Sequence, residues 1–198
     1  MPQTNARIAE LAGQQFHEHG ITATGVEALS RAAGISKRTL YERFGSKDGL
    51  IAAAYDALDG PVFEHITGPA ERASATPRGQ LDQLFVALAA LVGSPDFRGC
   101  PFANASSELA ARDHPAHAVI RRHKERLRRW ILSRARAAGA ADPGRLSRQL
   151  MLVFDGAQAQ SLVQRSSRPA RDAAEVARAL IDAAVAPQRE EARQVRAR

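Results

Sequence analysis

The chain has 198 residues, of which 44% are hydrophobic and 25% are charged, proportions that are typical of a soluble globular protein. No apolar run approaches the roughly 18 residues that a membrane-spanning helix needs, and residues 1–12 lack the hydrophobic segment of a signal peptide. Cys100 is the only cysteine, so an internal disulfide bond is excluded. We therefore expect a cytoplasmic protein that does not contact a membrane.

The net charge of +7 is typical of a protein with an acidic partner, but most of the excess charge lies in one segment. Residues 121–136 contain eight basic residues and one acidic residue, Glu125, so this segment alone carries a net charge equal to that of the chain. Basic residues spread around a long helix usually form a solvated face. The total charge by itself therefore does not identify a nucleic-acid-binding protein.

Apolar residues recur at helical spacing and no strand-like alternation persists, so the sequence predicts an all-α protein. The first predicted helix runs from Thr4 to His19 and ends at Gly20. Thr24 with Glu27 matches a capping box, and the helix that it opens ends near Gly34. The chain is thus expected to begin with two helices separated by a short connection.

Two further helices are predicted to start at serine caps. Ser36 caps a short helix that ends at Gly45, and Ser46 caps a fourth helix that reaches about Ile66. Residues 67–77 are rich in Gly, Pro, Ser and Thr, and this composition predicts a connection.

Five more helices are predicted, over residues 80–92, 102–112, 116–138, 145–164 and 170–186. The helices over residues 145–164 and 170–186 carry more apolar side chains than packing within one chain would bury. This favours a homodimer through these two helices. We expect three parts: a three-helix helix-turn-helix domain in residues 1–50, a larger helical domain in residues 51–187, and a polar tail in residues 188–198.

Residues 20–45 contain two short helices joined by a tight turn, the arrangement that presents a second helix to the major groove of DNA. The apolar side chains of this segment are expected to face inward: Val26, Leu29, Ile35, Leu40 and Phe44. This leaves Lys37, Arg38, Thr39, Tyr41 and Arg43 outside. A phenol and cations can both bind phosphate oxygens, so this outer face favours a DNA partner.

The motifs of this segment are Gly20-x-x-x-Thr24, Ala33-Gly34-Ile35-Ser36, Thr39-Leu40-Tyr41 with Phe44, and Ser46-Lys47. Together they resemble the DNA-binding domain of the TetR family of repressors, over residues 20–50. Residues 98–108, RGCPFANASSE, resemble the start of the C-terminal domain in one branch of that family. The resemblance implies a helical C-terminal domain that binds a ligand and dimerises.

The resemblance also implies roles for single residues in DNA binding. Those implied to read base edges are Lys37, Arg38 and Thr39, and those implied to bind phosphates are Thr24, Ser36, Tyr41, Arg43 and Lys47. Arg43 stands where the family commonly has His or Tyr, and a cation there should strengthen backbone contact without adding sequence information.

We therefore expect a ligand-responsive repressor that binds an inverted-repeat operator in double-stranded DNA as a homodimer and is released by a small-molecule effector. One alternative is a sequence-unspecific nucleic-acid-binding protein. Another is a helical enzyme, although the sequence shows no P-loop, dinucleotide glycine fingerprint, nucleophile elbow or zinc-protease motif.

A ligand pocket in the larger domain should combine apolar walls with a few polar groups. The candidates are Phe63, Phe85, Phe102, Asn104, Trp130, Phe154 and Gln158, with core packing as the alternative for Phe102, Asn104 and Trp130. Cys100 is either a redox sensor or a small buried thiol. His114, His117 and His123 do not complete a metal site, because Pro115 interrupts them and no Cys or carboxylate cluster joins them. No metal and no cofactor are expected.

Overall fold

The computed structural model describes residues 4–185, and the predicted tail of residues 188–198 lies outside them. Within the described range the chain forms helices only, which confirms the predicted all-α fold. None of these helices is long and apolar enough to cross a membrane. The helices are α1 (Asn5–His19), α2 (Val26–Ala32), α3 (Lys37–Phe44), α4 (Lys47–Ala73), α5 (Pro77–Val92), α6 (Pro101–Glu108), α7 (Ala116–Ala137), α8 (Pro143–Gln164) and α9 (Arg168–Val185).

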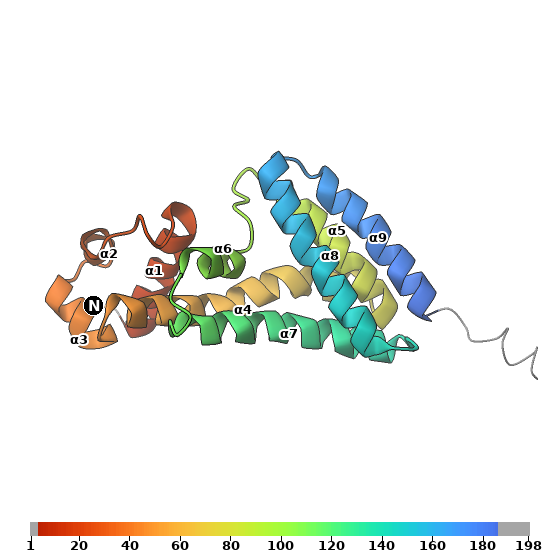
Figure 1. Cartoon of the computed structure of the whole chain (residues 1–198), viewed down its shortest axis with the longest axis horizontal. Helices are drawn as coiled ribbons and strands as arrows, with labels where there is room; N and C mark the ends of the chain where they lie inside the picture. The colour runs from red at the N-terminus through yellow and green to blue at the C-terminus, as the bar shows by residue number, and fades with distance from the viewer. Residues whose placement is uncertain (1–3, 186–198) are drawn as a thin grey trace, which may run out of the picture.

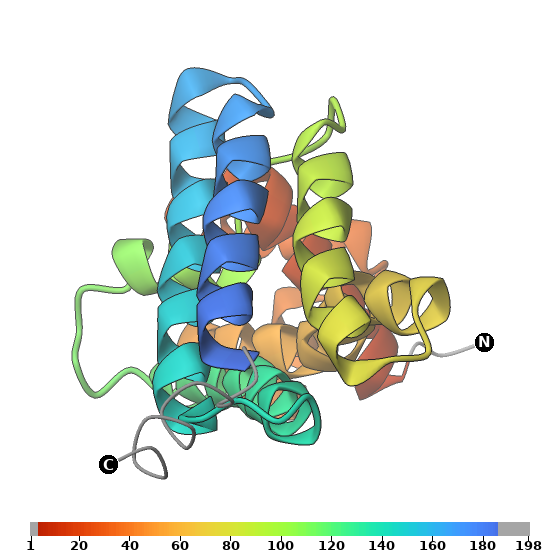
Figure 2. The ribbon, with the colours of Figure 1, turned by 90° about the vertical axis from the view of Figure 1, so that its right-hand side faces the viewer.

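Two long helices, α4 and α7, connect the two ends of an elongated molecule. They lie side by side and run in the same direction along the long axis (Figure 1). At one end, α1, α2 and α3 gather around the start of α4, whereas α5, α8 and α9 stand across the other end (Figure 2). The short helix α6 lies between the two groups and packs against α7.

The buried side chains form two apolar clusters. The larger holds the α5, α8 and α9 end together with the second halves of α4 and α7, and includes Leu84, Phe85, Leu150, Phe154 and Ile181. The other surrounds α1–α3 and includes Phe16, Leu29, Leu40, Leu50 and Tyr55, together with Phe102 of α6 and Ile120 of α7. The packing around the N-terminal helices therefore continues across residue 50 into α6 and α7.

Close contact between α1 and α4 depends on a glycine in α1. A Cβ atom at Gly13 would lie 2.9 Å from Cγ of Leu58 and 3.2 Å from the carbonyl oxygen of Ala54. Separations this short would force Leu58 or the α4 backbone to move. Gly13 therefore allows α1 to lie directly against the helix that leads into the larger part of the molecule.

The turn between α2 and α3 is fixed by local signals that the sequence predicts. Gly34 has a left-handed φ of 62°, its N–H donates to the carbonyl of Arg31, and the N–H of Ile35 donates to the carbonyl of Ser30. This pair of bonds is a Schellman ending of α2. The Oγ of Ser36 then accepts the N–H of Thr39 at 3.0 Å, which confirms the predicted cap of α3.

The predicted capping box at Thr24 is wrong. The residue that precedes α2 is Gly25, which has no side chain to cap the helix. Thr24 is buried, and its hydroxyl donates to the carbonyl of Gly20 at 2.6 Å. The hydroxyl therefore stabilises the loop after α1 instead of the first turn of α2.

Helix α4 extends beyond the predicted end at Ile66, through Pro69, to Ala73. Proline inside a helix removes one backbone hydrogen bond and costs about 3 kcal/mol, which is why the composition of this segment predicts a connection. Thr67 and Ala70 are buried, and Ala70 belongs to the larger core. Tertiary packing of this turn against α5 therefore overrides the local signal.

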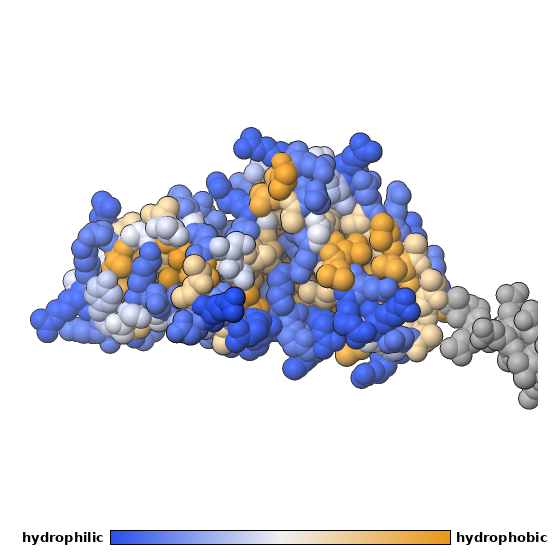
Figure 3. Space-filling view, viewed as in Figure 1, coloured by the Kyte–Doolittle hydropathy of each residue, from blue (hydrophilic) through white to orange (hydrophobic). Residues whose placement is uncertain are grey.

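The surface over α8 and α9 carries apolar side chains, which are visible in the hydropathy view (Figure 3). Leu152 and Val163 of α8 are 74% and 80% exposed, and Val176 of α9 is 50% exposed. Exposure this large is unusual for such side chains when they cluster on neighbouring helices. The two last helices thus present an apolar face to the outside.

Candidate functional site

The outer face of α3 carries the side chains that the sequence predicts for base reading. Leu40 is fully buried and anchors the helix, whereas the Tyr41 residue is 41% exposed and the Arg38 side chain is 88% exposed. Thr39 is half-buried, and its N–H and hydroxyl both bond Ser36. The structure therefore brings Lys37, Arg38 and Tyr41 together on one exposed surface at the end of the molecule.

Two of the cations on α3 form ion pairs with carboxylates of the same surface. Lys37 pairs with Glu27 of α2, and Nε of Arg38 lies 2.8 Å from Oε1 of Glu42. The Lys37 ammonium also lowers the pKa of the Glu27 carboxyl by hydrogen bonding. Exposed pairs of this kind contribute little to stability, so a phosphate or base edge can replace the carboxylates at little cost.

The residues predicted to bind phosphate differ in their accessibility. Lys47, the first residue of α4, donates from Nζ to the carbonyl of Ile21 at 3.0 Å, which joins α4 to the loop after α1. Arg43 is half-buried in the last turn of α3, and Ser36 is exposed. The buried hydroxyl of Thr24 is committed to Gly20, so its geometry gives no support to a direct phosphate contact.

Helix α6 and the loop after it contact the N-terminal helices directly. The backbone N–H of Thr22 donates to Oε2 of Glu108, the last residue of α6, at 3.0 Å. Nδ1 of His114 accepts the N–H of Ala116, and its Nε2 faces Oδ1 of Asp48 in the first turn of α4 at 3.4 Å. These contacts connect the helix-turn-helix end to a segment that lies far away in sequence.

A buried polar cluster joins α4 to α7. Nδ1 of His123 lies 2.7 Å from Oδ1 of Asp59, and Arg126 approaches the other carboxylate oxygen at 3.2 Å. The His123 ring stacks on Phe102 of α6 at a centroid distance of 3.7 Å. Burial lowers the pKa of His123, although the Asp59 carboxylate opposes this effect. Three helices, α4, α6 and α7, therefore meet at the His123 imidazole.

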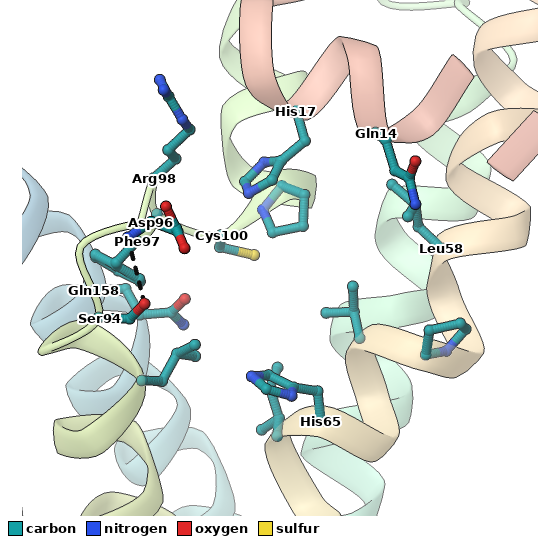
Figure 4. Close-up of a pocket in the computed structure, with 16 residues that line it drawn as sticks. Gln14, His17, Leu58, His65, Ser94, Asp96, Phe97, Arg98, Cys100 and Gln158 are labelled. Carbon is teal, nitrogen blue, oxygen red and sulfur yellow. Dashed lines mark hydrogen bonds between the residues drawn. The ribbon is translucent and has the colours of Figure 1, made fainter. Parts of the chain in front are cut away.

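A cavity of about 480 Å³ lies between α1, α4, α5, α8 and the segment 94–101 (Figure 4). Its walls are largely apolar and include Leu58, Val62, Ile66, Leu91 and Phe97. Its polar lining includes His17, His65, Cys100 and Gln158, which point toward the open space in Figure 4. An occupant would therefore contact both α1 of the helix-turn-helix and α8 of the larger part.

Only Gln158 among the predicted pocket residues lines this cavity. Phe85 and Phe154 pack edge to face in the larger core, where 6.0 Å separates their centroids. Phe102 belongs to the N-terminal core, and Asn104 donates to the carbonyl of Arg98 at 2.7 Å. Aromatic side chains fill the spaces between helices because burial of their large surfaces is more favourable than exposure in a cavity wall.

The two other aromatic candidates lie in contacts between α4 and α7. Nε1 of Trp130 donates to Glu71 at 2.6 Å, and Arg126 lies over the ring of Phe63, 4.0 Å from its centroid. The sequence does not single out His17 or Leu58 as cavity residues, because their helical periodicity indicates only packing. Among the described residues, no three His, Cys, Asp or Glu side chains form a group that could hold a metal ion.

Comparisons with known proteins agree with this arrangement. The profile of bacterial regulatory proteins of the tetR family matches residues 8–54, which cover α1–α3 and the start of α4. A TetR-type transcriptional regulator of Streptomyces avermitilis is 35% identical, and the alignment covers 92% of this chain and 98% of that chain with a TM-score of 0.81.

Two further relatives share part of the sequence or the fold. The transcriptional repressor DhaR of Mycobacterium sp. strain GP1 is 27% identical over 125 residues, and the match spans 63% of this chain but only 60% of DhaR. A cysteine mutant of the TetR-family regulator CifR, in a complex with 26-base-pair operator DNA, shows the same fold at 21% identity. Its TM-score is 0.73, and the alignment covers 92% of this chain and 99% of CifR. Because the Streptomyces avermitilis regulator matches over nearly its whole length, the chain belongs to the TetR family of bacterial transcriptional regulators.

Proposed function

We propose that the protein is a ligand-responsive repressor that binds an inverted-repeat operator as a homodimer and leaves it when a small molecule occupies the cavity. The observation that carries this proposal is the outer face of α3. Arg38 and Tyr41 are exposed there, while Leu40 fixes the helix to the core. A short helix held in this way can enter the major groove without rearranging its own domain.

Within this proposal, Lys37, Arg38 and Thr39 read base edges, and Tyr41, Arg43 and Lys47 hold phosphates. Guanidinium and ammonium groups bind guanine edges, whereas a phenol hydroxyl donates well to a phosphate oxygen. Lys47 lies at the N-terminus of α4, where backbone N–H groups also favour an anion. A phosphate bound there would tie DNA contact to the position of α4. Since an operator is part of chromosomal DNA, we place the protein in the cytoplasm.

The apolar face of α8 and α9 supports the homodimer. Leu152, Gly156, Ala159 and Val163 recur at intervals of four, three and four residues along α8, and all four are exposed. Val176, Ala179 and Ala183 form a corresponding exposed row on α9. Helices pack against each other along rows with this spacing, and the small residues of the row permit close approach of the two helix backbones.

Two-fold pairing through these helices would place two α3 helices on one face of the dimer. An operator with half-sites one helical turn apart, about 34–36 Å, fits such a pair. The relative CifR is a TetR-family regulator whose structure contains double-strand operator DNA. Its shared fold supports the same use of α3 in this chain.

The cavity supports a small-molecule effector because it touches both halves of the molecule. His17 comes from α1, His65 from α4 and Gln158 from α8. A ligand that prefers one spacing of these helices must favour one position of α1 and α4, and with it one spacing of the two α3 helices. If that spacing does not fit the operator, the ligand weakens DNA binding. By thermodynamic linkage, DNA then weakens ligand binding by the same coupling free energy, typically about 1–3 kcal/mol.

Selection of genomic fragments by the purified protein tests the proposal. We expect enrichment of one inverted-repeat sequence, and a footprint with two protected half-sites about 10–10.5 base pairs apart. The complex should survive an excess of unrelated DNA at physiological salt. If unrelated DNA removed the protein as readily as the selected fragment, the alternative of unspecific nucleic-acid binding would replace this proposal.

A further inference from the structure

The single thiol of the chain lines the cavity. Cys100 is 6% exposed, precedes the first turn of α6, and directs its sulfur into the open space in Figure 4. The neighbouring walls from α4 and α5, including Val62, Ile66 and Leu91, are apolar. A small neutral molecule that fills this space would therefore lie against a nucleophilic atom.

A second group in the same cavity points to a ligand independently of the thiol. Gln158 is 5% exposed, and its Nε2 has no hydrogen-bond partner among the described residues. The amide points into the cavity in Figure 4. A buried N–H group normally finds an acceptor, so Gln158 supplies a donor for an oxygen atom of an occupant.

A cation lies next to the sulfur on the side of α7. Burial lowers the pKa of the Lys124 ammonium, but electrostatic interaction with Cys100 and Asp155 outweighs burial and raises the value above its usual range. Lys124 also donates to Asp155 of α8 at 2.7 Å. The Lys124 ammonium therefore lies within electrostatic reach of the Cys100 side chain.

We propose that the effector is a small, neutral electrophile with a carbon–carbon double bond conjugated to a carbonyl group, and that Cys100 bonds to it covalently. The sulfur adds to the β-carbon, and the electron pair of the double bond moves toward the carbonyl oxygen. Gln158 donates to that oxygen as negative charge develops on it. The thiol proton ends on the α-carbon, so the step is an addition that needs no oxidant or reductant.

The position of Cys100 connects this reaction to DNA binding. Cys100 immediately precedes α6, and Glu108, the last residue of α6, accepts the N–H of Thr22 in the loop between α1 and α2. A group bonded to the sulfur would lie in the cavity between the start of α6 and the walls formed by α1 and α4, so it would favour the positions of these helices that fit around it. This inference rests on the proposed repressor function and names the chemistry of its effector.

Intact-mass spectrometry tests the reaction, because the chain has one cysteine. We would treat the folded protein with 2-cyclohexen-1-one and, separately, with its saturated analogue cyclohexanone. The enone should add one molecule per chain, with a rate constant above that of glutathione at the same pH. Cyclohexanone and the Cys100→Ser variant should give no adduct. Labelling only after denaturation, or labelling no faster than glutathione, would overturn the proposal.

Two variants on α8 separate the role of Gln158 from general effects on folding. Gln158→Leu should slow adduct formation at least about tenfold, because it removes the donor to the developing negative charge. Gln149→Leu, at the opposite end of α8, should leave the rate unchanged. Equal rates for wild type and Gln158→Leu would contradict the part assigned to Gln158.

Operator binding after modification decides whether the adduct is the signal. The modified wild type should lose affinity for its selected operator at least about fivefold, the lower end of typical allosteric coupling, and Cys100→Ser treated identically should not. An adduct that leaves operator affinity unchanged overturns the effector proposal alone. Unmodified protein that prefers no DNA sequence overturns the repressor function, whether or not the thiol reacts.

Discussion

The carboxylate of Glu108 accepts a hydrogen bond from the backbone N–H of Thr22 at 3.0 Å, so that the last residue of α6 holds the loop between α1 and α2. These residues are 86 positions apart in sequence. Because α6 begins beside the cavity and ends at this bond, it is a rigid connection between the candidate effector site and the helix-turn-helix.

Glu108→Ala should uncouple the two sites. We expect operator affinity without ligand to stay within about tenfold, since the removed bond is exposed and such a bond contributes about 0.5–1.5 kcal/mol. The ratio of operator affinities without and with a releasing compound should fall toward one. Fluorescence anisotropy with a labelled operator measures both values. An unchanged ratio would exclude this bond from the coupling.

Arg38→Ala should relax sequence discrimination. The Arg38 side chain is 88% exposed, and its ion pair within residues 4–185 is with the exposed Glu42, so its removal leaves the fold intact. A bidentate contact to a base contributes about 1–3 kcal/mol of discrimination, and we expect this loss at one position of each half-site. Binding to a panel of single-base operator variants measures it. Unchanged preferences would remove Arg38 from the base-reading residues.

Tyr41→Phe should weaken binding to all DNA sequences alike. Its hydroxyl is the group proposed to donate to phosphate, and a hydrogen bond to a charged group contributes about 1.5 kcal/mol, or about tenfold in affinity. Thermal unfolding should be unaffected, since the residue is 41% exposed. A loss confined to one operator position would show instead that Tyr41 reads a base.

Leu152→Asp combined with Val163→Asp should give a monomer. Both side chains lie on the exposed row of α8, and burial of each in a dimer would contribute about 1.5–3 kcal/mol. We expect the dissociation constant of the dimer to rise at least about 10³-fold, as measured by analytical ultracentrifugation. Val86→Asp, at an exposed valine of α5, is the matched control and should remain a dimer.

Acid should destabilise the protein through His123. Burial lowers the pKa of His123 against the opposing effect of Asp59, while Lys124 and Arg126 add to the lowering. As the pH falls, His123 therefore binds a proton in the unfolded chain before it does so in the folded chain. The stability due to this group is complete above the unfolded pKa of about 6.5 and is lost as the pH falls from there through the folded pKa.

Urea unfolding at pH 7.5 and pH 5.5 checks this expectation. Wild type should lose more free energy of unfolding between the two pH values than His123→Gln, which cannot titrate at this position. The pKa of His17 is also lowered by burial, so a smaller loss should persist in the variant. Equal losses in both proteins would show that the imidazole is not the titrating group.

The features that the sequence predicts correctly depend on signals between near neighbours. Gly34 ends α2 because a left-handed residue is needed there, and Ser36 caps α3 because its hydroxyl reaches a backbone N–H three residues on. The all-α fold and the exposed position of Arg38 follow from helical periodicity. The predicted cap at Thr24 fails because the Thr24 hydroxyl donates to the carbonyl of Gly20 instead of capping α2.

The arrangement of side chains between the helices depends on tertiary contacts. Patterns within short stretches of the sequence are enough to predict the fold class, the family resemblance and the outer face of α3. They do not determine that α4 continues through Pro69, that the predicted aromatic residues fill the cores, or that Cys100 and Gln158 meet at one cavity beside α1. These outcomes depend on contacts between residues far apart in the chain, where burial of apolar surface outweighs local preference.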